Sequence, residues 1–458
     1  METGYLKIIT TNDGAPIQAT ITVLNKNTIL YDLQTNENGS MDAVELEAPP
    51  IELSLDQKYM DAPYSTYDVK AEALGFTTIY IYDVMVFDGE LSILPINMPT
   101  SVEYEDTHGY LTTTAPKVSE SIEYHIPAHQ LTNMDGRRIE ASIPQHKLLP
   151  EIKIPEFITI HMGHPDSPAS NICIPFIDYI KNSASHEIYP TWPSAALEAN
   201  IYCIISLALN RVLTKSYRAK RNDFDVASGY DAYYHDFDIT NNPMFDPIYV
   251  KGGQIFRSID VMVDSIFNRF IKREGYQEPF FAKYSDGRHS TCPGLWQWGT
   301  VGLALRGLNA LEILRHYYPG DIQVVETDNI SGIEKPFPGY PLCEGMSCCH
   351  VWDLQVMLNR IAVNFPAIPT IDPVTGVYGP ETVATVKAFM HISGIEPDAA
   401  GDTIDRKIWN RISFAFSAIR RQNNDKPNLN EAISPCIENI PANQLLTMFF
   451  VSQALKRG

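Results

Sequence analysis

The feature that most constrains the fold is a long apolar segment, residues 193–212, near the middle of the chain. It follows a Thr-Trp-Pro sequence, and proline is favoured in the first turn of a helix. Its residues from Ala195 to Leu207 are almost all apolar, so the predicted helix has little polar face. A helix that is apolar all round must be covered by other elements. We therefore expect it at the centre of the largest domain.

The chain has 458 residues, of which 44% are hydrophobic and 20% charged. This length is too great for one ordinary domain, and the composition is typical of a folded protein. We predict a multidomain α+β protein. The predicted parts are a β-sandwich (1–102), a linker or pro-segment (103–155), a mixed α/β domain (156–320), a three-helix module (342–413) and a helical tail (414–458).

The formal net charge of −20 argues against a nucleic-acid partner, which requires clustered Lys and Arg side chains. We find no run of about 18 consecutive apolar residues, so no membrane span is predicted. The first residues, METGYLKIITTNDG, lack the basic region and apolar core of a secretory signal. The seven cysteines do not form a disulfide framework, and reduced thiols are predicted.

The first hundred residues have the pattern of short strands separated by turns, which is typical of a small antiparallel sandwich. The strand-like runs are Tyr5–Thr10, Ala19–Leu24, Thr28–Leu33 and Thr77–Val84. The turns around Gly14-Ala15-Pro16 and Asn38-Gly39, with the later segment Ala73–Phe76, resemble carboxypeptidase-regulatory-like modules. This part is predicted to be a scaffold. Residues 103–155 contain scattered prolines and are predicted to be a linker open to proteolysis, with extra strands as the alternative.

Three blocks in the middle of the chain carry the main resemblance. The first runs from Tyr179 to Asn200 and includes Glu187 followed by Ala-Leu-Glu-Ala-Asn; the second runs from Cys292 to Ala304, and the third from Glu312 to Tyr318. In this order they resemble the SpoIID/LytB family of lytic transglycosylases, in which a glutamate precedes an Ala-Leu-Lys-Ala-Gln helix and a Gly-Met-Ser-Gln-Tyr/Trp-Gly segment follows. The resemblance implies that Glu187 is the catalytic residue.

The implied chemistry needs one carboxylic acid near the bond between N-acetylmuramic acid and N-acetylglucosamine. Glu187 would protonate the leaving oxygen and then accept a proton from the C6 hydroxyl of the sugar, which closes a 1,6-anhydro ring. Burial at the junction of two helices is expected to raise its pKa. The alternative is that Glu187 merely caps a helix turn. Substrate contacts are predicted for Gln297, Trp296, Trp298, Tyr189, Tyr233 and Tyr234.

Neither a metal nor another cofactor is predicted. His186-Glu187 lacks the second histidine of a zinc protease, because that position is Pro190. The cluster of Cys343, Cys348, Cys349 and His350 matches no standard zinc spacing.

Residues 342–413 resemble the three-helix peptidoglycan-binding domain. The matching segments are Leu354-Gln355-x2-Leu358-Asn359, Asp372 to Thr382 with its Gly-Pro helix start, and Val386-Lys-Ala-Phe389. The resemblance implies a peptidoglycan partner.

The order of the parts is similar to that of spore cortex-lytic enzymes. It implies a zymogen that is made in the mother-cell cytoplasm, acts on cortex glycan in the germinating spore, and is activated by a protease that cuts the pro-segment. Trp296 stands where the SpoIID/LytB family has serine, and Thr291 where many members have histidine. These departures leave open a non-catalytic spore protein that binds peptidoglycan.

Overall fold

The computed structural model describes residues 2–12, 15–101, 121–129, 152–218, 235–288, 293–332, 335, 337–395 and 403–422. It divides the chain into two compact units, Met1–Ser331 and Gly332–Gly458. Helices and several separate sheets occur along the chain, which confirms a mixed α+β protein at this coarse level.

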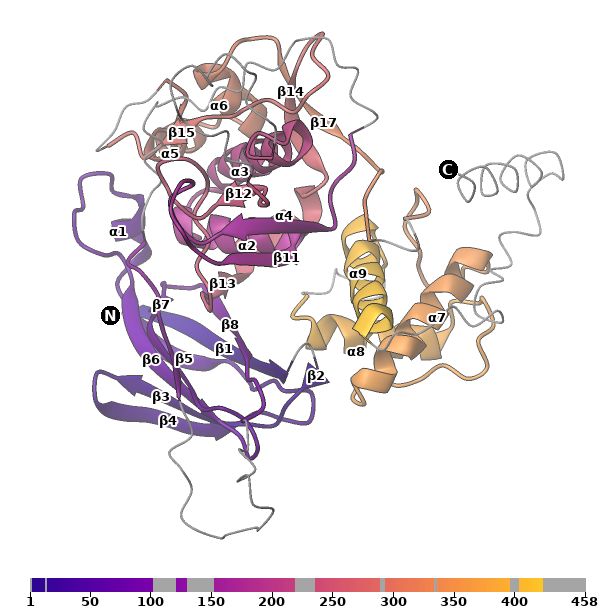
Figure 1. The fold of residues 1–458 in the computed structure, drawn as a ribbon. Helices are drawn as coiled ribbons and strands as arrows, with labels where there is room; N and C mark the ends of the chain where they lie inside the picture. The colour runs from indigo at the N-terminus through magenta and orange to yellow at the C-terminus, as the bar shows by residue number, and fades with distance from the viewer. Residues whose placement is uncertain are drawn as a thin grey trace, which may run out of the picture. The chain divides into compact units, whose positions relative to one another are not determined.

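The N-terminal part contains two five-stranded sheets that contact each other through β7 and its neighbours (Figure 1). One sheet consists of β13 (Ile255–Phe256), β8 (Leu91–Asn97), β1 (Glu2–Asn12) and β2 (Ala15–Pro16), with β5 (Val44–Ala48) also on β1. The other consists of β4 (Thr28–Gln34), β3 (Thr20–Asn25), β6 (Ser65–Glu72), β7 (Ile79–Val86) and β9 (Ile122–His125). Along β1, buried and less buried residues alternate, as expected for a strand with one face on a core.

Two details of this part differ from the sequence prediction. The β1–β8 and β7–β9 pairs are parallel, so the sheets are mixed and not purely antiparallel. Residues 122–125 also lie in the segment predicted to be a linker, yet they complete a sheet as β9. The alternative of extra strands is therefore correct for these four residues. A short helix, α1 (Ile51–Leu55), follows β5.

The apolar segment forms α3 (Ser194–Thr214), and fourteen of its residues are buried. α3 contacts α5 (Gln297–Leu305), β14 (Arg269–Arg273), α6 (Ala310–Tyr317), α2 (Phe176–Glu187) and α4 (Arg257–Ile266). The prediction of a central buried helix is confirmed. α3 is also long and apolar enough to cross a membrane, although it contains no long run of consecutive apolar residues. In the structure, 78% of its most apolar window is buried in protein.

Around α3 lie three small sheets. In the first, β10 (Phe157–His161) lies between β11 (Asn171–Pro175) and β12 (Ile239–Thr240). In the second, β14 pairs with β17 (Ile322–Glu326), and in the third, β15 (Tyr284–Ser285) pairs with β16 (Leu295–Trp296). α2 is joined to α4 by a buried ion network, in which the Lys181 ammonium lies 2.5 Å from Asp260 and 2.6 Å from Asp264.

The amphipathic pattern over residues 255–272 predicts a single long helix, and this prediction is wrong at both ends. Ile255–Phe256 pairs with β8 as a strand, α4 occupies Arg257–Ile266, and Arg269–Arg273 pairs with β17. Strand partners far away in the sequence override the local periodicity here. β17 itself lies between the predicted mixed α/β domain (156–320) and the predicted three-helix module (342–413).

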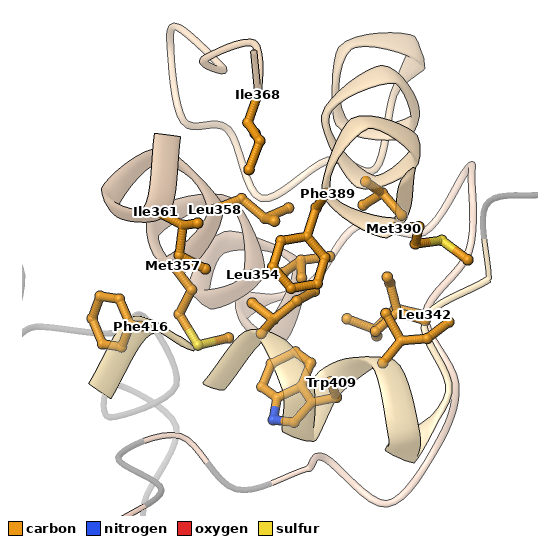
Figure 2. Packing of buried hydrophobic residues seen from close by; sticks show 14 of the residues in the cluster. Leu342, Leu354, Met357, Leu358, Ile361, Ile368, Phe389, Met390, Trp409 and Phe416 are labelled. Carbon is orange, nitrogen blue, oxygen red and sulfur yellow. The ribbon is translucent and has the colours of Figure 1, made fainter. Parts of the chain in front are cut away.

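The second unit contains α7 (Cys349–Asn364), α8 (Pro380–Ile392) and α9 (Arg406–Gln422). Figure 2 shows side chains from all three helices meeting around Leu354, with Phe389 from α8 and Trp409 from α9. α9 extends past the predicted boundary at 413, and the helix predicted over 441–455 lies outside the described residues.

The side chain of Gln355 fixes the loop before α8. Its amide oxygen accepts hydrogen bonds from the backbone N–H groups of Thr375 and Gly376, and its amide nitrogen donates to Val377 and Thr382. Cys349 is disulfide-bonded, so the prediction of reduced thiols is wrong for this residue, whereas Cys173, Cys203, Cys343 and Cys348 are free.

Candidate active site

Glu187 is the last residue of α2, and its side chain is fully buried. Its Oε1 accepts a hydrogen bond from the backbone N–H of Ile248 at 2.8 Å, and its Oε2 accepts one from the Tyr284 hydroxyl at 2.6 Å. Burial, and then the adjacent Glu187 charge, raise the pKa of Tyr284 well above its ordinary value, so this hydroxyl keeps its proton and donates it. The site thus holds one carboxylate between two donors.

The segment 247–250 lies along α2 and supplies the first of these donors. Ser183 donates to the carbonyl of Ile248, and Asn182 both donates to and accepts from the backbone of Val250. Sequence reasoning missed this segment. The signal was present in α2 itself, where Asn182 and Ser183 interrupt a buried helix and need buried partners.

The segment is anchored at its N-terminal end by Asp246. Its carboxylate accepts hydrogen bonds from Arg211 at 2.6 Å, from the Tyr217 hydroxyl at 2.6 Å and from Thr240 at 3.0 Å. Because Asp246 and Arg211 are both buried, breaking this pair would leave an uncompensated charge in the interior. The donor at Ile248 is therefore held by the α3 helix through Arg211.

The three sequence blocks meet beside Glu187. From α3, Asn200 donates to the Thr300 hydroxyl of α5 at 3.0 Å. Tyr284, the donor to Glu187, is paired in β15 with Leu295 of the second block. Tyr318 of the third block donates to the carbonyl of Lys283, next to Tyr284, at 2.6 Å. Each block thus contacts either α3 or the strand that carries Tyr284.

Two aromatic residues that closely follow Glu187 in the chain belong to an aromatic cluster. Tyr189, Trp192 and Trp298 lie with ring centroids 5.1–5.7 Å apart, and all three side chains are mostly buried. The N-terminal part covers this cluster: Trp192 donates to the carbonyl of Ser54 at 3.0 Å. Arg288 donates to the carbonyl of Tyr59 at 3.0 Å, and its guanidinium lies 5.8 Å from the Trp298 ring.

The predicted substrate residues occupy different environments. Trp296 is 40% exposed, whereas Trp298 is buried at 3% and Gln297 at 0%. Both polar atoms of the Gln297 amide are buried without a hydrogen-bond partner, and so is the indole nitrogen of Trp298. Tyr233 and Tyr234 lie outside the described residues.

Trp296 and Trp298 line a groove of about 620 Å³, together with Tyr317, Arg306, His316 and Gln57. Gln57 belongs to the loop after α1, so one wall of the groove comes from the N-terminal part. Glu187 does not line this groove. The predicted catalytic residue and the predicted sugar-binding tryptophans are therefore not in one pocket; they are linked through β15, whose Tyr284 donates to Glu187 and whose Ser285 pairs with Trp296.

Two histidines lie beside Glu187, of which His186 is buried and His129 half-buried. His186 has its Nδ1 2.8 Å from the carbonyl of Asn182, and His129 has its Nε2 3.1 Å from the carbonyl of Ile188. Burial lowers the pKa of His186 to about 4; burial and the neighbouring His186 lower the pKa of His129 to about 3. Gly253 lies so close to His186 that a Cβ at this position would be 2.3 Å from the histidine ring.

Within the described residues, no group of three or more His, Cys, Asp or Glu side chains is arranged to hold a metal ion. His161 instead lies within hydrogen-bonding distance of Asn171 and the carbonyl of Ser167, at 2.8 and 2.9 Å. His350 lies 2.8 Å from the Tyr340 hydroxyl.

Comparison with known proteins provides little further information. No protein-family model matches the chain, and no curated protein matches it. Among solved structures, the Bacillus anthracis TIE protein is similar at 20% sequence identity over 22% of this chain and 17% of that chain, with a TM-score of 0.15.

Proposed function

We propose that this protein is a peptidoglycan lytic transglycosylase, with Glu187 as general acid and then general base. The support is the convergence of the three blocks that resemble the SpoIID/LytB family: the first contains Glu187, and the other two contact the segment that carries Tyr284, the donor to Glu187. A single carboxyl group is sufficient for a reaction that uses the C6 hydroxyl of the substrate as nucleophile.

The second unit supports peptidoglycan as the substrate. Its three helices and the Gln355-centred loop carry the residues that resemble the peptidoglycan-binding domain, including Asn359, whose amide holds the backbone of Ile371. By the same resemblance we propose spore cortex as the site of action, a non-catalytic role for the N-terminal sheets, and an activating protease as a partner.

Enclosure of Glu187 favours a zymogen. Each of its two oxygens accepts a hydrogen bond from a protein donor, and the neighbouring Trp192 and Arg288 donate to carbonyls of residues 54–60 in the N-terminal part. In this proposal, substrate reaches Glu187 after this cover moves, and the movement frees the orphaned polar atoms of Gln297 to bind sugar.

The same enclosure supports a second candidate function, a peptidoglycan-binding protein without turnover. In that case Glu187 is a structural acceptor that fixes the segment at Ile248 and the strand at Tyr284. The two candidates differ in product and not in binding.

The discriminating experiment compares the wild-type protein with Glu187→Gln on purified cortex peptidoglycan, before and after limited proteolysis. A glutamine can accept from Ile248 through its oxygen and donate to the Tyr284 oxygen, so the fold is expected to be retained. We expect anhydro-muropeptides from the wild type and none from Glu187→Gln, with equal binding to the polymer. Equal release of anhydro products by both proteins would rule out Glu187 as the acid.

A further inference from the structure

The groove beside the site has an unusual charge for this protein. The chain carries 55 acidic against 35 basic residues, yet the described residues that line the groove include no Asp or Glu. They include Arg306 and His316, at the end of α5 and within α6. A groove with an arginine, a histidine and no carboxylate in an acidic protein favours an anionic ligand.

Arg306 is available to such a ligand. Its Nε donates to the carbonyl of Gly302 in its own helix, at 3.2 Å, and no described carboxylate pairs with it. Several other arginines of this unit do pair with carboxylates, among them Arg211 with Asp246, Arg269 with Glu326, and Arg273 with Asp321. An exposed guanidinium offers a planar pair of donors that matches a carboxylate.

The rest of the groove is suited to a sugar ring. The exposed Trp296 lies against Tyr317 with ring centroids 6.3 Å apart. These rings sit on glycines: a Cβ at Gly287 would lie 2.4 Å from Trp296, and one at Gly299 would lie 2.0 Å from the Tyr317 hydroxyl. Aromatic faces with a few fixed polar groups are typical of small-ligand sites.

We propose that this groove binds the acidic sugar of the glycan, with the ring on Trp296 and the carboxylate on Arg306 and His316. This inference rests on the proposed function and adds the substrate class of one subsite: a muramyl residue that carries a free carboxylate. The carboxylate belongs either to the lactyl group of an unsubstituted muramic acid or to its peptide stem. A bulky tryptophan in place of the family's serine is then a sugar platform and not an obstruction.

The test measures binding by calorimetry to full-length Glu187→Gln, so that turnover plays no part. The ligands are the disaccharide N-acetylglucosaminyl-N-acetylmuramic acid, the same disaccharide with its peptide stem, and neutral di-N-acetylchitobiose. We expect the acidic disaccharides to bind more tightly than chitobiose. Arg306→Gln should weaken the acidic ligands about tenfold, the worth of one charge-assisted hydrogen bond, and leave chitobiose unchanged. Trp296→Ala should weaken all three ligands.

Arg273→Gln is the control, because it removes an arginine of β14 that does not line the groove. Chitobiose binding as tightly as the acidic disaccharides, or an unchanged affinity in Arg306→Gln, would overturn the proposal, as would the absence of binding by all three ligands. Tighter binding of the peptide-bearing disaccharide places the carboxylate in the stem. Tighter binding of the unsubstituted disaccharide, whose lactyl carboxyl is not consumed in an amide bond, places it on the lactyl group. Binding as expected with no cleavage by the wild type would refute the transglycosylase and leave the groove assignment intact.

Discussion

At the scale of single residues, the Glu187 carboxylate depends on one side chain that has no motif of its own. Tyr284 is fully buried, and its hydroxyl is the donor to Oε2. Nothing in the local sequence distinguishes it from other tyrosines of the chain, since its role arises from the pairing of β15 with β16. Sequence reasoning predicted Glu187 as the acid and could not predict the hydrogen-bond donor to it.

Tyr284→Phe would leave one carboxylate oxygen buried without this donor. We expect a loss of about 1–3 kcal/mol in the free energy of unfolding, measured by urea denaturation. Tyr276→Phe, at an exposed tyrosine, is the control and should change the stability very little. Equal stabilities of Tyr284→Phe and the wild type would mean that the Glu187–Tyr284 hydrogen bond contributes nothing to the fold.

The two histidines beside Glu187 give stability a pH dependence. The pKa of His186 is lowered to about 4 and that of His129 to about 3, whereas both titrate near 6.5 in the unfolded chain. Between about pH 6.5 and pH 4 the unfolded state therefore binds more protons, and stability falls as the pH falls. Each histidine contributes a slope of about 1.4 kcal/mol per pH unit well below pH 6.5.

His129→Phe keeps an aromatic ring against Tyr189 and removes one titrating group. Urea denaturation at pH 7 and pH 5 should show a smaller loss of stability in this variant than in the wild type. His164→Gln, at an exposed histidine, should lose as much stability as the wild type. An unchanged loss in His129→Phe would show that this ring is not held neutral.

At the scale of elements, prediction succeeded where the pattern is local and failed where the partner is distant. The helix at residues 193–212 and the Gly-Pro helix start at residues 379–380 were predicted within a few residues, because a proline start and apolar spacing specify them. β13, β14 and β9 were missed, because each is a strand through pairing with a segment far away in sequence. The same holds for the site: block order indicated Glu187, whereas the donor at Ile248 depends on tertiary packing.

The pairing of β13 with β8 bears on how the proposed zymogen would be activated by proteolysis. β13 immediately precedes α4, and the N–H of Ser258 donates to the buried Glu90 of the N-terminal part at 3.0 Å. Phe87 also lies against Phe256 and Tyr189, with ring centroids 5.2 and 5.6 Å apart. The N-terminal sheets and the candidate active site therefore share a strand pair and an apolar contact.

After a protease cut between residues 130 and 151, we expect the two fragments to remain associated. Size-exclusion chromatography of the cut protein should give one peak with both fragments, and urea should be needed to separate them. Phe87→Ser, which removes the shared ring, should weaken the association, whereas Ile29→Ser, at an exposed residue of β4, should not. Separation of the wild-type fragments in buffer would show that this interface is too weak to hold them.

At the scale of the whole molecule, the proposed function divides between the two units. The Met1–Ser331 unit contains the enclosed acid, the aromatic cluster and the groove, and the Gly332–Gly458 unit contains the three helices that resemble a peptidoglycan-binding domain. Binding of the polymer and cleavage of its glycan are then separable properties. Loss of the second unit should reduce action on intact cortex more than action on short soluble glycans.

The most direct test of the central claim is digestion of cortex peptidoglycan in heavy-oxygen water by the protein cut between residues 130 and 151. A transglycosylase closes the product with the C6 hydroxyl of the sugar, so we predict 1,6-anhydro-muropeptides that carry no heavy oxygen, and none from Glu187→Gln. Products with heavy oxygen at a new reducing end would show hydrolysis, and an undigested polymer to which the cut protein still binds would show a binding protein; either result would contradict the account.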